Sequence, residues 1–189
     1  KTAYELSACL VGSEMCISDR NIYMRVAFAP FFDRAESPFD IPGINTGFVP
    51  QDLDHVEADD SWLFSGYMAD HSPSPIYRRA ADGTITKFYV TLPDGSAYDG
   101  HGSAITTNEQ YANLACEEGY LVIPMDSLLF AEDGACVQAA EKVGVDFSPA
   151  FMNIEQGQLL LGNFYYPNDY ETPENHHITT PDGTETVSY

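Results

Sequence analysis

Short runs of β-prone residues recur along the chain from residue 51 onward, and polar turns separate them. The runs are rich in Val, Ile, Thr, Tyr and Phe, with Gly, Pro, Asp and Asn between them, which is typical of strands. We expect strands at 51–57, 62–68, 75–79, 85–92, 102–107, 111–116, 119–124, 135–143, 149–154, 158–165 and 184–188. Helix signals are sparse, and the best is one turn within MDSLLFAEDG, capped by Asp126 or Ser127. The pattern therefore predicts an all-β fold.

Two independent features repeat with a period of roughly 50 residues. The dipeptide Asp-Gly recurs at positions 82, 133 and 182, at spacings of 51 and 49 residues, each time before a β-prone run. The runs WLFSGYM, YANLAC and LLLGNFYY begin at Trp62, Tyr111 and Leu159, at spacings of 49 and 48 residues. Each of these runs follows a polar turn. Four short strands in a unit of this length are typical of a β-propeller blade.

We therefore predict a single β-propeller-like domain over residues 1–189, made of repeated four-stranded antiparallel blades of about 48–50 residues. Blade-like repeats are expected at 47–99, 100–146 and 147–189. Residues 1–46 form an irregular N-terminal part, in which NIYMRVAFAPFF is one strand or two. Three clear units and one doubtful unit are fewer than is usual for this architecture. Three alternatives fit three to four blades: the ring is small, the chain belongs to a longer propeller, or a partner completes an incomplete ring.

An excess of acidic residues limits the partners of this chain. There are 8 Lys and Arg against 29 Asp and Glu, which gives a formal net charge of −21. Because almost nothing neutralises phosphates, nucleic acid and anionic membranes are excluded as partners. No apolar stretch approaches the roughly 20 residues that span a bilayer, so membrane insertion is excluded as well. The composition suits divalent cations or cationic ligands, and an acidic surface is typical of many secreted bacterial proteins.

The four cysteines leave the disulfide state open: Cys9, Cys16, Cys116 and Cys136. No two of them form a Cys-x-x-Cys pair, so a zinc site or a thioredoxin-type motif is not expected. The even count allows two disulfides, with Cys9–Cys16 as the easiest pairing, and free buried thiols fit equally well. The chain opens with Lys1 and shows no signal peptide, which suggests a mature or trimmed product.

Several segments in a fixed order resemble one known group of proteins. They are FVPQDLDHVEADDSWLFSGYM, GHGSAIT, GYLVIPMDSLL, VDFSPAFMNIEQGQLLLGNFYY and TPENHHITTPDGTE, and they span roughly residues 46–189. In them the chain resembles secreted bacterial β-propeller proteins of the SMP-30/gluconolactonase, NHL and YncE-like type. Two departures stand out. The third unit has Gly162-Asn163-Phe164 where the group's pattern is closer to Gly-Glu-Phe, and the group's chains continue for further blades beyond the position of Tyr189.

In a propeller the first strand of each blade lines the central channel, so functional side chains from successive blades are expected to meet at its entrance. The polar residues at these positions are Gln51, Asp52, Asp54, His101, Ser103, Ser148 and Asn153. They lie far apart in the sequence, but the repeat brings them together.

The resemblance also implies a metal site. Lactonases of the SMP-30 type hold one divalent cation with carboxylate and amide oxygens from several blades, and such ligands suit calcium or magnesium. By this resemblance the candidate ligands of Ca²⁺ or another divalent cation are Asp52, Asp54, Asn153 and Asn163. The alternative is that these residues are polar groups that cap turns.

His101 is the candidate catalytic residue. It stands between two glycines, which allow close approach to the backbone, and a histidine is a suitable general base because its pKa lies near neutrality. The alternative is a structural histidine that is hydrogen-bonded between blades. The sequence motifs of serine hydrolases, zinc peptidases, phosphate-binding loops and dinucleotide-binding loops are absent from the chain.

Two further clusters lie near the C-terminal end. The densest polar group is Glu174, Asn175, His176 and His177. Adjacent histidines on a strand point to opposite faces, so both bind one metal only in a loop, and a plain surface loop is the alternative. The aromatic run at 164–166 suits either stacking on sugar rings or packing in a blade core.

Three functional hypotheses remain. The first is a secreted or cell-surface bacterial β-propeller domain that binds a small-molecule or carbohydrate ligand without catalysis. The second is a divalent-metal-dependent hydrolase of lactonase type with His101 as base. The third is a truncated propeller that acts as an assembly or interaction module, since an incomplete ring exposes strand edges and favours a homo-oligomer.

Overall fold

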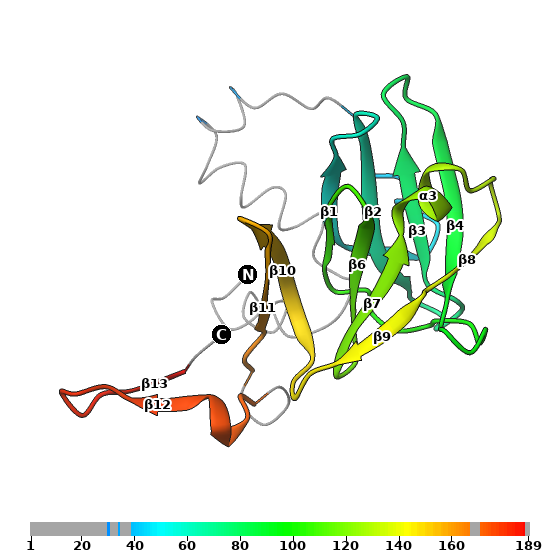
Figure 1. Ribbon diagram of the computed structural model, residues 1–189. Helices are drawn as coiled ribbons and strands as arrows, with labels where there is room; N and C mark the ends of the chain where they lie inside the picture. Colours follow the sequence, from blue (N-terminus) through cyan, green and yellow to red (C-terminus); the bar gives the residue numbers. More distant parts are fainter. Residues whose placement is uncertain (1–29, 31–33, 35–38, 167–170, 188–189) are drawn as a thin grey trace, which may run out of the picture. The chain divides into compact units, whose positions relative to one another are not determined.

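The computed structural model of the chain (Figure 1) describes residues 30, 34, 39–166 and 171–187. The chain separates into two compact units, residues 1–40 and 41–189, and nearly all described residues belong to the second. Apart from Pro30, the run NIYMRVAFAPFF with its expected strand lies outside the described residues, as does the pairing Cys9–Cys16. A single domain over residues 1–189 therefore stays a prediction.

The first sheet has five strands and is built mainly from consecutive hairpins. Four strands pair antiparallel in chain order: β1 (Phe48–Val56), β2 (Ser61–Met68), β3 (Pro75–Arg79) and β4 (Ile85–Thr91). β8 (Cys136–Gln138) joins the edge of this sheet and runs parallel to β4.

The second sheet has four strands in the order β5-β6-β7-β9. β5 (Ile105–Thr107), β6 (Tyr111–Cys116) and β7 (Gly119–Pro124) form an antiparallel meander, and β9 (Glu141–Gly144) pairs antiparallel with β7. The short helix α3 (Met125–Leu129) follows β7 directly and buries Met125 and Leu128.

Two separate hairpins complete the described chain. β10 (Pro149–Glu155) pairs with β11 (Gln158–Asn163). The 3-10 helix η1 (Glu174–His176) leads into β12 (His177–Thr179), which pairs with β13 (Glu185–Val187). In the part of the chain that the structure describes, each hairpin is a sheet of two strands.

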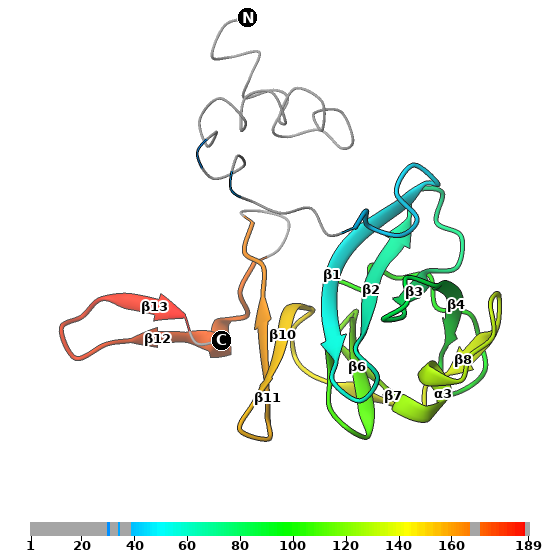
Figure 2. The ribbon, with the colours of Figure 1, turned by 90° about the horizontal axis from the view of Figure 1, so that it is seen from above.

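The main hydrophobic core lies between the first two sheets, which Figures 1 and 2 show as two layers. Leu63 and Phe88 of the first sheet and Leu121 of the second are fully buried, and Leu114 of the second sheet is 2% exposed. Burial of such side chains is the main stabilising contribution to the fold, at roughly 1.5–3 kcal/mol each.

A smaller core joins the second sheet to the β10–β11 hairpin. Ala115 of β6 points away from the main core, because successive residues of a strand face opposite sides, and Ala104 just before β5 joins it. Met152 of β10 packs against them, together with Leu159 and Leu161 of β11. The second sheet is therefore covered on both faces.

The prediction of an all-β chain is confirmed. The structure has several antiparallel sheets, and none closes into a barrel within the described residues. The strands expected at 75–79, 111–116 and 119–124 begin and end as predicted. The propeller itself stays a prediction.

The single strand expected at 135–143 is wrong, because the chain changes sheets in the middle of this range. The Ala139 N–H donates to Thr91 O at the end of β4, at 2.9 Å, and the Ala140 N–H donates to Val122 O of β7, at 2.8 Å. The residues before this crossing therefore form β8 in the first sheet, and those after it form β9 in the second.

The strand expected at 102–107 begins only at Ile105, and two smaller predictions also fail. The helical turn is present, but it begins after Pro124 and no side chain caps it, so neither Asp126 nor Ser127 is its cap. The strand expected at 158–165 ends at Asn163. Both errors lie at element boundaries, where hydrophobic pattern carries little information.

The Asp-Gly repeat is structurally equivalent at two of its three positions. At Asp82-Gly83 the carboxylate accepts the amide two residues later and backbone bonds close the turn between β3 and β4; the same bonds recur at Asp182-Gly183 between β12 and β13. Asp133-Gly134 instead docks on β4. Asp133 Oδ1 accepts from Lys87 N at 2.8 Å, and Gly134 N donates to Lys87 O at 2.7 Å.

Candidate functional site

The first strands of three hairpins, β1, β5 and β10, lie beside one another in space, in the same order as in the chain. β1 contacts β5, and β5 contacts β10, although they belong to different sheets. Side chains rather than strand pairing must therefore bridge them. Most of the polar residues that were predicted to converge lie where β1 contacts β5 and where β5 contacts β10.

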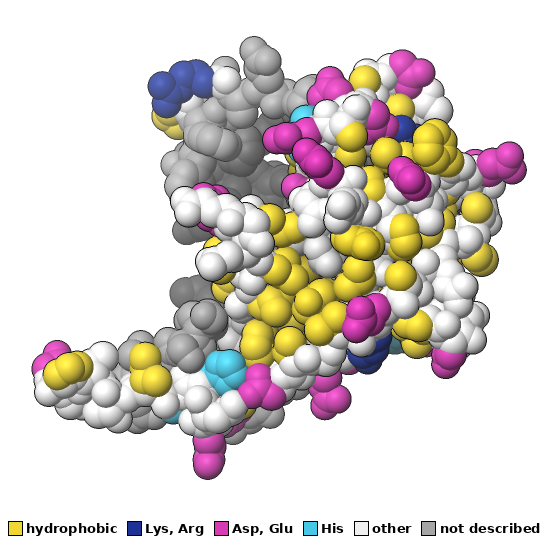
Figure 3. All heavy atoms as spheres, in the orientation of Figure 1, with side chains coloured by type: hydrophobic (Ala, Val, Ile, Leu, Met, Phe, Trp, Pro, Cys, Tyr) yellow, Lys and Arg dark blue, Asp and Glu magenta, His cyan; other side chains and the backbone are white. Residues whose placement is uncertain are grey.

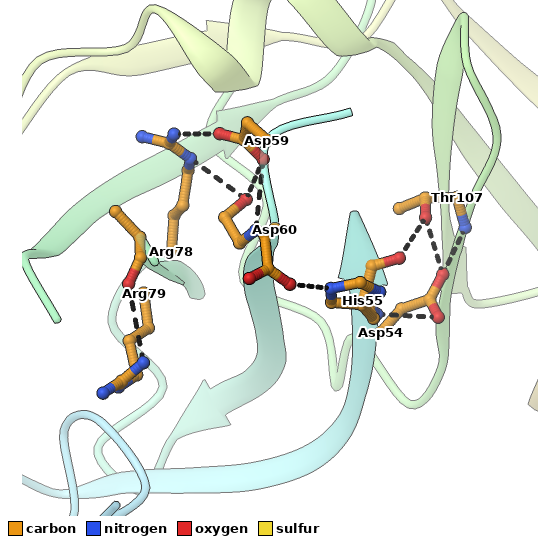
Figure 4. A network of polar contacts seen from close by, with 9 residues as sticks. Asp54, His55, Asp59, Asp60, Arg78, Arg79 and Thr107 are labelled. Carbon is orange, nitrogen blue, oxygen red and sulfur yellow. Dashed lines mark hydrogen bonds and ion pairs between the residues drawn. The ribbon is translucent and has the colours of Figure 1, made fainter. Parts of the chain in front are cut away.

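Two aspartates of β1 bind the backbone of β5. Asp52 Oδ2 accepts from Ile105 N at 2.9 Å. Asp54 Oδ2 accepts from Thr107 N at 2.6 Å and from the Thr107 hydroxyl at 2.8 Å (Figure 4). The other oxygen of each carboxylate accepts the N–H of the residue that follows it, at 2.9 and 3.0 Å. We term this arrangement the Asp52–Asp54 clip, since it fastens an edge strand of the second sheet to the first.

The clip places the Asp52 carboxylate in a partly buried environment. Burial raises the pKa of Asp52, and the like charge of Asp54 adds to the rise. Hydrogen bonds from Ile105 and Leu53 oppose it. Two backbone amides hold this carboxylate in place, so its role in the clip is structural.

A second polar network holds the turn between β1 and β2 (Figure 4). Asp59 pairs with Arg78 of β3 and accepts the Ser61 hydroxyl at 2.6 Å. Burial raises the pKa of Asp59, but the hydrogen bonds from Ser61 and Arg78 outweigh burial and leave it below its ordinary value. His55 Nε2 lies 2.7 Å from Asp60 Oδ1. These contacts stabilise the turn between β1 and β2.

Side chains from five separate stretches of the chain line a pocket of about 610 Å³, which we term the His101 pocket. Its lining residues are Gln51, His101, Ser103, Cys116, Glu117, Ser148, Pro149, Ala150 and Phe164. The structure thus brings together four of the predicted first-strand positions, namely Gln51, His101, Ser103 and Ser148.

Two β-bulges aim residues at this pocket. The register of β1 on β2 shifts between Pro50 and Asp52, and the register of β10 on β11 shifts between Pro149 and Phe151. The extra residues are Gln51 and Ala150, and both line the pocket. Bulges redirect side chains and are over-represented beside binding sites.

His101 and Glu117 form the polar wall of the pocket. His101 Nδ1 lies 3.9 Å from Glu117 Oε1, and the two side chains are 59% and 57% exposed. The His101 ring packs edge-on against the Tyr67 ring, with centroids 4.8 Å apart. Neither Glu117 nor Tyr67 was predicted, because a turn carboxylate and a strand-end tyrosine give no sequence signal of their own.

A buried tyrosine fixes the backbone beside His101. The Tyr98 hydroxyl accepts from Gly102 N at 3.0 Å and donates to Ala115 O at 3.3 Å. Burial raises the pKa of Tyr98, so the hydroxyl stays neutral and can do both. Gly102 has φ +53°, and a Cβ there would lie 3.2 Å from the Gly66 carbonyl oxygen. Glycine is therefore needed next to His101.

The two described cysteines, Cys116 and Cys136, are free thiols. Burial raises the pKa of Cys116 to about 11, so this pocket residue is a neutral, weakly nucleophilic thiol. The alternative of buried free thiols therefore applies to Cys116, whereas Cys136 is exposed.

A second pocket of about 650 Å³ lies at the other end of the same first strands, and we term it the Asp54 pocket. Its lining residues are Asp54, His55, Val56, Glu57, Ala58, Thr106, Thr107, Asn108, Glu109, Asn153 and Ile154. The predicted positions Asp54 and Asn153 meet here. The lining has three carboxylates and no Lys or Arg, so it disfavours anions.

The four predicted metal ligands lie in different surroundings, and three of them make hydrogen bonds to other groups. Asp52 and Asp54 form the clip, Asn153 lines the Asp54 pocket, and Asn163 Nδ2 lies 3.5 Å from the Thr172 hydroxyl. Within residues 39–166 and 171–187 no group of three or more His, Cys, Asp or Glu is arranged to hold a metal ion. Both aspartates bind amides of β5 and do not cap a turn, and a Ca²⁺ site stays a prediction.

The polar cluster at 174–177 forms a clamp and does not bring its histidines together. Asn175 donates to Asp146 Oδ2, and His176 Nε2 lies 3.0 Å from Asp146 Oδ1. The His176 ring also packs edge-on against Phe147. His177 Nε2 instead lies 3.2 Å from Thr172 O. The cluster therefore ties η1 to the loop before β10.

Acid is expected to open this clamp. Hydrogen bonds from His176 and then Asn175 lower the pKa of Asp146 below its ordinary value of 3.8. Since the native pKa is depressed, the stabilisation is complete above pH 3.8 and is lost as the pH falls through the lower native value. Amide-exchange protection of residues 171–177, corrected for intrinsic rates, should fall in that window. Asp146→Ala should remove the protection already at neutral pH, and unchanged protection in this variant would contradict the clamp.

The surface is unevenly divided between apolar and acidic groups. Hydrophobic side chains gather in the middle of the face drawn in Figure 3, over the region of β7, β9 and β10, while Asp and Glu side chains stand mainly around them. Exposed large apolar residues include Phe151, Leu160, Phe164 and Ile178. No helix within the described residues is long and apolar enough to cross a membrane.

Comparison of the chain with protein-family models, with curated proteins and with solved structures finds no match. The resemblance to SMP-30, NHL and YncE-like propellers therefore stays a hypothesis.

Proposed function

We propose that this protein is a ligand-binding domain that holds a small carbohydrate-like molecule in the His101 pocket without chemical conversion. One observation carries the proposal. Gln51, His101 and Ser148 are about 50 residues apart in sequence, yet all line one pocket of about 610 Å³. A concave site with a few converging polar groups and an apolar wall is the usual form of a small-molecule site.

The lining of the pocket suits a polyhydroxylated ring. Phe164, Pro149 and Ala150 offer apolar surface, and an aromatic ring binds the C–H face of a sugar by stacking. Glu117 and Gln51 offer a carboxylate and an amide that pair with hydroxyl groups. Ser103 and Ser148 already bond to Pro149 O and Glu118 N, at 2.7 and 3.2 Å, so they shape the wall more than they bind.

The negative charge of the pocket and of the chain limits the charge of the ligand. The lining of the His101 pocket contains a carboxylate and no Lys or Arg, and the chain carries a net charge of −21. An anionic ligand would be repelled both locally and by the long-range field. A neutral or cationic sugar is favoured over an acidic one.

The proposal includes a propeller-like architecture located outside a bacterial cell. It is supported by the order of the first strands β1, β5 and β10, by the face-to-face packing of successive sheets, and by the same Asp-Gly turn in two repeats. The acidic composition supports the location. The lactonase alternative has less support, because three of the four predicted ligands of its cation are hydrogen-bonded to other groups.

Neutral sugars are expected to bind the protein, and Phe164→Ala is expected to weaken this binding about tenfold. Loss of one stacked ring removes roughly 1–1.5 kcal/mol. Saturation-transfer NMR with glucose, galactose, N-acetylglucosamine and glucuronate, followed by calorimetric titration of the best binder, measures the effect. Phe151→Ala is the matched control, since Phe151 is 54% exposed against 57% for Phe164 and lies outside the pocket.

A second pair of variants tests the charge argument. Glu117→Gln should weaken binding of a neutral sugar less than Phe164→Ala, but it should reduce the discrimination against glucuronate. Glu109→Gln makes the same charge change in the Asp54 pocket and should leave both unchanged. Equal affinity in Phe164→Ala and the parent, or preference of the parent for glucuronate, would refute the proposal.

A further inference from the structure

The strand β11 presents an open edge in the described part of the chain. It pairs with β10 alone, and β12 pairs with β13 alone. Sheets of two strands are marginally stable in water, and an open edge attracts another strand. The first two sheets have no such gap, because β3 adds to β2 and β7 adds to β6.

The hairpin β10–β11 repeats the register of β1–β2. In β1–β2, Pro50 opposes Gly66 and, after a bulge, Asp54 opposes Leu63. In β10–β11, Pro149 opposes Asn163 and, after a bulge at the same place, Asn153 opposes Leu160. Leu160 is therefore the equivalent of Leu63.

The hairpin β12–β13 repeats β3–β4 in the same way. Both are closed by an Asp-Gly turn with the same hydrogen bonds, and Arg79 opposes Ile85 as Thr179 opposes Glu185. Each residue of β12–β13 lies 100 positions after its equivalent in β3–β4, so Ile178 is the equivalent of Arg78.

The first sheet shows how two such hairpins pair, since β1–β2 and β3–β4 are the equivalents of β10–β11 and β12–β13. β3 adds to β2 with Leu63 opposite Arg78. Transferred to the third repeat, this register places Leu160 opposite Ile178. An independent observation agrees with it, because these two side chains are large, apolar and 49% and 48% exposed. Cross-strand neighbours of this kind shield each other from water.

The connection is long enough for this pairing within one chain. Residues 162–176, which are 15 residues, would link Leu161 of β11 to its partner His177, against the 12 residues 65–76 that link Phe64 to Tyr77. The geometry points to β11 as the docking edge for β12 of the same chain, antiparallel and with Leu160 opposite Ile178, which completes a third four-stranded sheet. This inference is independent of the proposed ligand.

Cysteine pairs test the docking and its register in the full chain. Cys9, Cys16 and Cys136 are first replaced by serine, and Cys116 is kept because it is 4% exposed. Leu160→Cys with Ile178→Cys should form an intramolecular disulfide on mild oxidation. Asn153→Cys with Leu160→Cys is the positive control, since these residues oppose each other in β10–β11.

A one-residue shift supplies the negative control. Leu160→Cys with Thr179→Cys should not cross-link, because adjacent strand residues point to opposite faces. Absence of the 160–178 bond while the positive control forms overturns the inference. A 160–178 bond found only between two chains, as a covalent dimer, overturns docking within one chain and shows exchange of hairpins between copies.

A second measurement needs no cysteine. Ile178→Glu puts a charge opposite Leu160 and should accelerate amide exchange of residues 158–163 at least fivefold. Ile44→Glu changes a residue of the same type that is 47% exposed and should leave these amides unchanged. Equal exchange of residues 158–163 in both variants would count against the docking.

Discussion

Replacement of Asp52 and Asp54 together by alanine is expected to lower the free energy of unfolding by about 3–5 kcal/mol, since a hydrogen bond to a charged group is worth roughly 1.5–3 kcal/mol. The change removes the acceptors of Ile105 N, Thr107 N and the Thr107 hydroxyl, and it leaves edge amides of β5 without their partners. Urea unfolding followed by fluorescence of the single tryptophan, Trp62, measures the effect.

The control for the clip is the charge-matched double variant Glu57→Ala and Glu109→Ala, which alters two exposed carboxylates of the Asp54 pocket. It should shift the free energy of unfolding by less than about 0.5 kcal/mol, as surface changes do. Titration of the parent with CaCl₂ and with chelator separates a clip from a metal site. A calcium-dependent rise in the unfolding midpoint that the Asp52 and Asp54 variant lacks would restore the predicted metal ligands.

Gly66→Ala is expected to destabilise the fold by about 2–3 kcal/mol and to abolish sugar binding in the His101 pocket, since overpacking a tight site costs 1–3 kcal/mol. A Cβ at this position would lie 2.2 Å from the Val49 carbonyl oxygen. This contact is with backbone, so no side-chain rotation relieves it. The strand must move at the bulge that carries Gln51, and Gly102 beside His101 rests on the same backbone.

Gly144→Ala is the control for this substitution. Its added Cβ would lie 3.9 Å from the Glu118 carbonyl oxygen, which is an ordinary contact, and Gly144 has no positive φ. We expect a change within about 1 kcal/mol, with stabilisation favoured because alanine restricts the unfolded chain. Unfolding midpoints and the sugar titration are compared for both variants. A Gly66→Ala protein that binds sugar like the parent would show that the bulge does not shape the pocket.

Sequence alone predicted most strands because alternation and turn residues are local signals. The hairpin partners of Trp62, Tyr111 and Leu159 follow from short turns. The crossing at Ala139-Ala140 was missed because it depends on which distant edge each alanine amide meets, β4 or β7. Nothing in the run CVQAAEKV encodes that choice, since strand propensity does not specify which partner strand a segment meets.

The candidate site was predictable in outline and not in detail. The repeat placed Gln51, His101, Ser103 and Ser148 in equivalent first-strand positions, and the structure gathers them in one pocket. The task of Asp52 and Asp54 was not predictable, because their partners are amides 53 residues away in the chain. A carboxylate that holds backbone and one that holds a cation look alike in sequence.

The return of β8 to the first sheet has a consequence for synthesis of the protein. As the chain emerges from the ribosome, β4 keeps an open edge until residues 136–138 arrive, although β1 to β4 are already complete. By then β5, β6 and β7 of the second sheet have been made but β9 has not, so the first sheet is finished by a segment that lies between two strands of its neighbour. The second repeat thus supplies a strand to the sheet of the first, which is incomplete without it. The folding of the two repeats is therefore coupled into one cooperative step.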